Sequence, residues 1–125
     1  MSLDAIGIVS KDIAQSVKFY KLLGVDLKVT GGADHLEGST PSGVRIMLDS
    51  VTLMKSLNPS WQVPTGSGIT LCFKQSTPGQ VDDVFHKVIE AGFKEAKAPW
   101  DAFWGQRYAS VVDPDGNQID IFAIL

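Results

Sequence analysis

The fold of this chain is decided by the stretch RYASVVDPDGNQIDIF, residues 107–122, which has the pattern of two strands joined by a tight turn. Pro114 fixes φ near the value that the first turn position needs, and Gly116 can adopt a positive φ. We therefore predict a type I turn closed by a bulge, a connection typical of short hairpins.

The strand that follows this turn alternates between two faces. Ile119 and Ile121 share one face, while Asp120 and Phe122 share the other. If the isoleucines face the core, the carboxylate and the aromatic ring face a second, more accessible space. Such a pair suits either a metal site or a pocket for a small molecule, so Asp120 and Phe122 are candidate site residues.

The composition is that of an ordinary globular domain. At 125 residues, with 44% hydrophobic and 20% charged residues, the chain can bury one core and needs no second domain. The net charge of −3 and the lack of a Lys or Arg run argue against a nucleic-acid partner. Without a leader pattern or an apolar run of the roughly 20 residues that a membrane helix needs, we expect a cytoplasmic protein and no membrane partner. Cys72 is the only cysteine, which excludes an intrachain disulfide.

The chain carries nearly the same order of elements twice. In the first half, a strand at residues 3–9 leads into a helix that Asp12 can cap and that Gly24 can end. Short strands are predicted after it, at residues 25–30, 35–38 and 44–48. In the second half, a strand at 68–74 leads into a helix that begins with the capping box TPGQ at 77–80. That helix is predicted to end at Gly92, before a strand at 93–96 and the terminal hairpin.

Residues 58–67 separate the two halves, and their two prolines and small polar side chains are typical of a linker. We predict an α+β fold in which a single domain, residues 1–125, contains two βαβββ modules at about 1–57 and 68–125. Each module would bury one face of a curved sheet under its helix, and the opposite faces would line a trough. Alternation assigns the core to Ile6, Ile8, Ile69, Leu71, Phe73, Ile119 and Ile121. It assigns the trough to Leu3, Ala5, Gly7, Val9, Thr70, Cys72, Asp120 and Phe122.

Three segments carry a resemblance to a known family: LDAIGIV at 3–9 with Asp12, FYKLLG at 19–24, and the tail from WGQR at 104–107 through DPDGN to Asp120. They resemble the vicinal oxygen chelate superfamily, which holds glyoxalase I, extradiol dioxygenases, fosfomycin-resistance enzymes and bleomycin-resistance proteins. The resemblance covers essentially the whole chain. It implies paired βαβββ modules that form an eight-stranded sheet around a cleft, often in a homodimer.

The resemblance also implies where a metal would be held in the enzymes of this superfamily. Their ligand positions fall here on Ala5, Met47, Thr70 and Asp120. Alanine has no donor atom and threonine has only a neutral hydroxyl, so we expect no metal and no cofactor. The two histidines, His35 and His86, are predicted to be solvated surface residues.

Aromatic residues give a second indication of a site. Trp100, Phe103 and Trp104 crowd a predicted loop beside the terminal hairpin, and Trp61 lies in the linker. Such rings at the rim of a trough can sandwich a planar ligand. They can equally plug the ends of the sheet or a dimer interface. Arg107, next to this loop, is included among the candidate ligand-binding residues.

Two further side chains have alternative roles. Asp120 is a hydrogen-bond acceptor or a base that faces the ligand, or else it forms a structural ion pair with Arg45 or Arg107. Cys72 is predicted to line the trough as a small, buried, apolar side chain rather than as a nucleophile, because nothing basic adjoins it in sequence.

The function predicted from these features is that of a glyoxalase/bleomycin-resistance-like protein, which binds a small, partly aromatic molecule in a metal-free cleft. It would resemble the drug-sequestering antibiotic-resistance proteins and would be a homodimer. The alternative is an enzyme: a glyoxalase-type lyase or a dioxygenase of the same superfamily, or a metal-independent isomerase with Asp120 as its base. In a third hypothesis the cleft is vestigial and the protein acts through its dimer surface.

Overall fold

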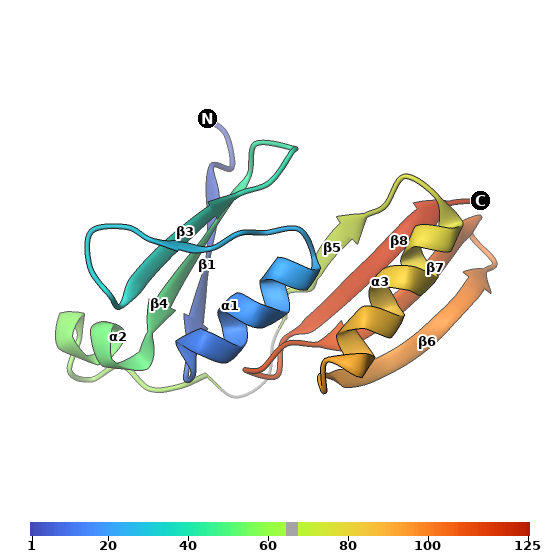
Figure 1. Cartoon of the computed structure of the whole chain (residues 1–125). Coiled ribbons are helices and arrows are strands. Elements are labelled where there is room, and N and C mark those ends of the chain that lie inside the picture. The colour runs from blue at the N-terminus through green and yellow to red at the C-terminus, as the bar shows by residue number, and fades with distance from the viewer. Residues whose placement is uncertain (65–67) are drawn as a thin grey trace. The chain divides into compact units, whose positions relative to one another are not determined.

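The computed structural model describes residues 1–64 and 68–125. The chain divides into two compact units, Met1–Thr65 and Gly66–Leu125, and each unit is built on its own four-stranded sheet (Figure 1). The first unit contains β1 (Ala5–Ser10), α1 (Ile13–Leu22), β2 (Lys28–Val29), β3 (His35–Ser39), β4 (Arg45–Ser50) and α2 (Val51–Leu57). The second unit contains β5 (Leu71–Lys74), α3 (Pro78–Glu90), β6 (Lys94–Ala102), β7 (Gln106–Val112) and β8 (Gln118–Ile124).

The two sheets have the same topology. Their strand orders are β1-β4-β3-β2 and β5-β8-β7-β6. In each sheet the strand before the long helix pairs in parallel with the last strand, and the remaining neighbours are antiparallel. The predicted α+β class with a repeated order of elements is therefore confirmed.

The helices begin and end at the residues that the sequence indicates. Asp12 caps α1 by accepting a hydrogen bond from the backbone N–H of Gln15 at 3.2 Å, and Thr77 forms a complete capping box with Gln80 at the start of α3. Gly24 and Gly92 follow the helices with φ angles of 86° and 93°. These predictions are confirmed because capping depends on residues that are close in sequence.

Helix α2 is an element that the sequence patterns do not predict. It has only seven residues and none of them is buried, so it lacks the apolar stripe by which longer helices are recognised. Ser50 caps it by accepting a hydrogen bond from the N–H of Leu53 at 2.9 Å. None of the helices in the described ranges 1–64 and 68–125 has the length and apolar character needed to cross a bilayer.

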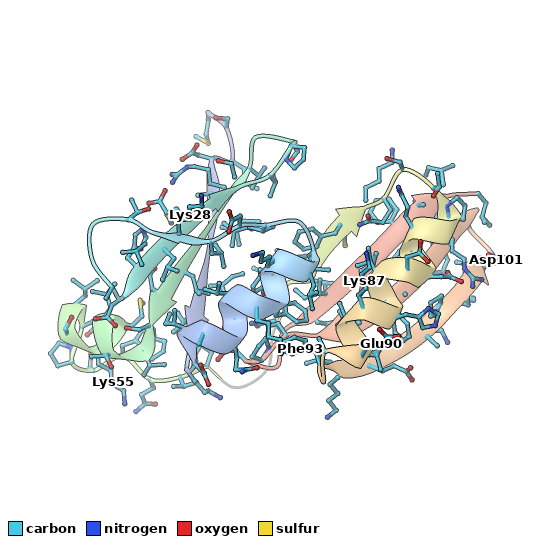
Figure 2. The ribbon with its side chains drawn as sticks, in the orientation of Figure 1. Lys28, Lys55, Lys87, Glu90, Phe93 and Asp101 are labelled. Carbon is cyan, nitrogen blue, oxygen red and sulfur yellow. The ribbon has the colours of Figure 1, made fainter. Side chains whose placement is uncertain are left out.

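Each unit has an apolar layer between its sheet and its long helix. In the second unit, Val81 and Val88 of α3 and Ile119 and Ile121 of β8 have no exposed surface. The outer side of α3 carries charged side chains such as Lys87 (Figure 2). In the first unit, the largest fully buried side chains include Phe19, Tyr20 and Leu48. Ile8, Ile119 and Ile121 are confirmed as core residues, whereas Ile6, Leu71 and Phe73 are half-buried.

Two predicted strands have different limits in the structure. Strand β5 begins at Leu71, which pairs with Ile119 near the start of β8, so Ile69 lies outside the strand and is 73% exposed. The prediction that Ile69 belongs to the core is wrong for this reason. Strand β6 runs to Ala102 instead of ending near 96, because β7 offers a partner along this length. Its register shifts between Lys97 and Trp100, where Pro99 has no N–H to donate.

The hairpin that closes the second sheet has the predicted turn chemistry. The N–H of Gly116 donates to the carbonyl oxygen of Asp113 at 3.1 Å, and Gly116 has a φ of 88°. The turn fixes the register of β7 and β8, in which Ser110 lies opposite Asp120 and Tyr108 opposite Phe122.

Candidate functional site

One face of the second sheet carries the strongest candidate site. Helix α3 lies along the other face (Figure 1), where Ile119 and Ile121 are buried. Alternation along the paired strands then places four predicted site residues together on the face opposite α3, which we call the open face: Cys72 of β5, Trp100 of β6, and Asp120 and Phe122 of β8. Tyr108 and Ser110 of β7 lie on the same face, and the sequence did not predict them as site residues.

Four aromatic side chains form a continuous series on the open face, and we call them the aromatic row: Trp100, Trp104, Tyr108 and Phe122. The ring of Trp104 is 5.4 Å from that of Trp100 and 5.4 Å from that of Tyr108, in both cases nearly perpendicular. Tyr108 and Phe122 have centroids 6.1 Å apart and planes 24° apart. Trp104 is fixed further because its Nε1 donates to Oε1 of Gln106 at 2.9 Å.

The strand assignment of Trp100 corrects the sequence prediction. Trp100 belongs to β6 and lies opposite Tyr108, so it is part of the sheet and not of a loop. Phe103 and Trp104 do lie in the turn between β6 and β7, but Phe103 is 92% exposed at the tip. Trp61 is half-buried in the first unit, beyond α2.

Asp120 is the polar centre of the open face. Its side chain is only 7% exposed, and it accepts hydrogen bonds from the hydroxyl of Tyr108 at 2.6 Å, the hydroxyl of Ser110 at 2.7 Å and Nε2 of Gln118 at 3.0 Å. Burial of the Tyr108 phenol, together with its hydrogen bond to Asp120, raises the pKa of Tyr108 well above its ordinary value. Tyr108 therefore stays protonated and keeps donating to the carboxylate.

The alternative that Asp120 pairs with an arginine is wrong. Arg107 alternates to the α3 side of the sheet, where its Nε and Nη2 donate to Asp82 of α3 at 2.9 and 2.8 Å. Its Nη1 donates to Asp101 (labelled in Figure 2) at 3.1 Å. The hydrogen bonds from Arg107, and after them its positive charge, lower the pKa of Asp82. Because Arg107 faces away from the aromatic row, we leave it out of the proposed site.

Cys72 lies on the predicted face but not in the predicted environment. It pairs in register with Asp120, yet it is exposed, so the prediction of a buried side chain is wrong. The reason is that, among the strands that the structure describes, β5 lies at the edge of its sheet beside β8. Thr70 precedes β5 and is also exposed.

The first unit holds a second group of polar side chains, which we call the charge cluster: Asp4, His35, Glu37, Arg45 and Asp49. Nδ1 of His35 is hydrogen-bonded to Asp49, which lies opposite it on β4, and Nε2 is 2.8 Å from Oε2 of Glu37. Arg45 donates to Glu37 and, at 2.7 Å, to Asp4. Ala5 and Met47, both half-buried, share this face of the first sheet.

His35 is not the solvated residue that the sequence predicts. Its side chain is 26% exposed and lies between two carboxylates, of which Asp49 and then Glu37 raise the pKa of His35 above 6.5. The signal that reveals this environment is the cross-strand register of β3 and β4, which the sequence alone does not fix. His86 is exposed on α3, as predicted.

Replacing His35 with glutamine should destabilise the protein in a pH-dependent way. A raised folded-state pKa means that the imidazolium contributes its full stability below pH 6.5 and loses it as the pH rises through the raised pKa. We expect a loss of about 1–2 kcal/mol in the free energy of unfolding at pH 6, and a smaller loss at pH 9. Urea denaturation at both pH values measures this. His86→Gln is the control and should change neither value; an equal loss for His35→Gln at both values would contradict the argument.

The donor set at the metal positions implied by the resemblance does not fit a divalent transition ion. Ala5, Met47, Thr70 and Asp120 carry a methyl group, a thioether, a hydroxyl and one carboxylate, whereas such ions are held by three or four N, O or S donors such as His, Cys, Asp and Glu. Within the part of the chain that the structure describes, no three His, Cys, Asp or Glu side chains form a group that could hold a metal ion. That the four positions gather around one hollow stays a prediction.

Comparison with known proteins gives a family and a fold. The model of the Glyoxalase/Bleomycin resistance protein/Dioxygenase superfamily matches residues 2–121. A glyoxalase/bleomycin resistance protein/dioxygenase family enzyme from Burkholderia phytofirmans PsJN is 23% identical, with a TM-score of 0.82 over 100% of both chains. A glyoxalase-related enzyme from Fulvimarina pelagi is 18% identical, with a TM-score of 0.83 over 98% of this chain and 87% of that one. A hypothetical protein from S. aureus is 19% identical, with a TM-score of 0.82 over 98% and 92%. None of the curated protein sequences is significantly similar to the chain.

Proposed function

The chain belongs to the glyoxalase/bleomycin resistance protein/dioxygenase superfamily, and on that premise we propose that it binds a small, planar, partly aromatic molecule on the open face of its second sheet. The binding needs no metal ion. The observation that carries this proposal is the aromatic row, which leads directly to the hydrogen-bonded carboxylate of Asp120.

The aromatic row supplies the apolar part of such a site. Its rings follow one another at 5.4–6.1 Å across three strands, which leaves ring faces and edges for a flat molecule to stack against. Each well-placed aromatic pair contributes about 0.5–1.5 kcal/mol beyond the burial of apolar area. Trp104 is 48% exposed, so a ligand that covers it removes apolar surface from water.

The polar atoms of the open face orient the ligand. Small-molecule sites typically combine an apolar lining with a few fixed polar groups. Here Tyr108 and Ser110 are fixed by their bonds to Asp120. Nε1 of Trp100 is buried and has no hydrogen-bond partner among residues 1–64 and 68–125, so it is a donor that an acceptor on the ligand can satisfy.

We propose binding rather than turnover, in the manner of a protein that sequesters its ligand. A general base must reach the proton of its substrate with a free lone pair. Three of the roughly four lone-pair sites of the Asp120 carboxylate already accept, from Tyr108, Ser110 and Gln118, which leaves one site on Oδ2 for a ligand. This arrangement holds the carboxylate still and suits recognition better than proton transfer.

Titration with acridine, a planar three-ring molecule, tests the proposal. We expect saturable quenching of tryptophan emission, because Trp100 and Trp104 lie in the row. Bound acridine should also slow the reaction of exposed Cys72 with a disulfide reagent, since Cys72 lies opposite Asp120. Neither effect should change with EDTA. Adamantanol, which is apolar but not planar, is the control, and it should neither quench tryptophan emission nor slow the reaction of Cys72. No effect of acridine on either signal, or a requirement for metal, would refute the proposal.

A further inference from the structure

We infer that the molecule bound on the open face is a cation and that Asp120 is its counter-ion. This inference rests on the proposed function and specifies the chemical class of the ligand: a planar aromatic system that carries a protonated amine or another localised positive charge. Neutral analogues should bind less tightly, and anionic ones least.

The negative charge of Asp120 has no partner of opposite sign. The side chain is 7% exposed, and its three hydrogen-bond donors, Tyr108, Ser110 and Gln118, are all neutral. None of the ion pairs between residues of the described ranges includes Asp120. Buried carboxylates are usually paired, because hydrogen bonds from neutral groups orient a charge without cancelling it.

Both arginines of the chain form ion pairs with carboxylates other than Asp120. Arg107 binds Asp82 and Asp101 on the far side of the same sheet, and Arg45 binds Asp4 and Glu37. Lys74 and Lys97 share the open face by register, but neither forms an ion pair with Asp120, so among the described residues this carboxylate has no salt-bridge partner. Acidic side chains also outnumber basic ones in residues 68–125, which favours the approach of a cation.

The rings around Asp120 are suited to the same ligand. Tyr108 donates to Asp120, and Phe122 follows it on the same face of β8 and stacks beside Tyr108. Aromatic faces attract cations. The aromatic row already shows this behaviour, because Nζ of Lys97 lies 4.9 Å from the ring centroid of Trp100. A ligand whose charged nitrogen reaches Asp120 can therefore stack its rings on the row.

A charge series on one ring system tests the inference. The probes are an aminoacridine that is protonated at neutral pH, neutral acridine, and an acridine carboxylate. With the wild-type protein, we expect the Kd of the aminoacridine to be about tenfold lower than that of acridine, as for one charge-assisted hydrogen bond. The carboxylate should bind most weakly. In Asp120→Asn, which keeps the side-chain size, the two Kd values should differ by less than about threefold.

The outcomes separate this inference from the proposed function. If none of the three probes binds, the proposed function itself fails. If all three bind to the wild type with similar Kd values, the open face is a binding site but the inference is overturned. A preference for the cation that persists in folded Asp120→Asn also overturns it, because the preference then comes from the overall acidity of the unit. If Asp120→Asn does not fold, the wild-type series is measured at about 0.1 M and 1 M salt: a preference for the cation that persists at 1 M supports a contact with buried Asp120, and a preference lost at 1 M overturns the inference, because salt screens the overall charge of the unit.

Discussion

Asp113→Ala should lower the free energy of unfolding by about 2–4 kcal/mol. Asp113 is 4% exposed, and its carboxylate accepts hydrogen bonds from other residues of the turn. Its Oδ1 accepts from the N–H groups of Asp115 at 2.9 Å and Asn117 at 2.8 Å, and its Oδ2 accepts from Nδ2 of Asn117 at 2.8 Å. Alanine would leave these donors without that acceptor. The midpoint of urea denaturation, at unchanged slope, measures the loss.

Asp113→Asn is the matched control for this prediction. Its side-chain oxygen can still accept from the two backbone N–H groups, and only the bond to the Asn117 amide is lost. The loss should therefore be less than about half that of Asp113→Ala. Equal losses in the two variants would show that the backbone donors do not depend on this acceptor.

The same turn links the stability of the fold to the composition of the proposed site. It sets the register that places Tyr108 opposite Phe122 and Ser110 opposite Asp120. A slip of one residue would move these side chains to the α3 side of the sheet. The short stretch from residue 107 to 122 therefore determines both the hairpin and most of the polar atoms of the open face.

This dependence on nearby residues explains which features could be predicted from the sequence. The caps at Asp12 and Thr77, the turn at Gly116 and the shared face of Asp120 and Phe122 all follow from residues within a few positions of each other. Local patterns of this kind fix dihedral angles and alternation directly. They gave the right class of fold, and they placed on one face the two residues around which the site is proposed.

Features that depend on pairing between distant segments could not be predicted. The environment of His35 depends on the register that places it opposite Asp49, and the length of β6 depends on β7. Cys72 is exposed because β5 is an edge strand, which only the strand order of the sheet reveals. Sequence periodicity assigns a residue to a face, but it does not say which strand lies beside it.

Trp104→Ala should weaken the binding of the aminoacridine probe by about 30-fold, the effect of losing one aromatic anchor in a small binding site. Trp104 joins Trp100 to Tyr108 in the aromatic row, so its removal interrupts the surface on which the ligand stacks. Because its side chain is 48% exposed, the free energy of unfolding should change by less than about 1 kcal/mol. The fluorescence of the probe and the protection of Cys72 measure binding without relying on tryptophan emission.

The control for this variant is Phe103→Ala, in the same turn. The Phe103 ring packs on Trp104 at 4.9 Å but is 92% exposed at the tip, away from Asp120 and the paired strands. Its removal should change the Kd of the probe by less than about threefold. If the two variants lose affinity equally, the ligand binds at the tip of the turn and not on the open face. The proposed site predicts that the two neighbouring rings differ about tenfold in their effect, because Trp104 contacts Tyr108, which donates to Asp120, whereas Phe103 packs on Trp104 at the tip of the turn.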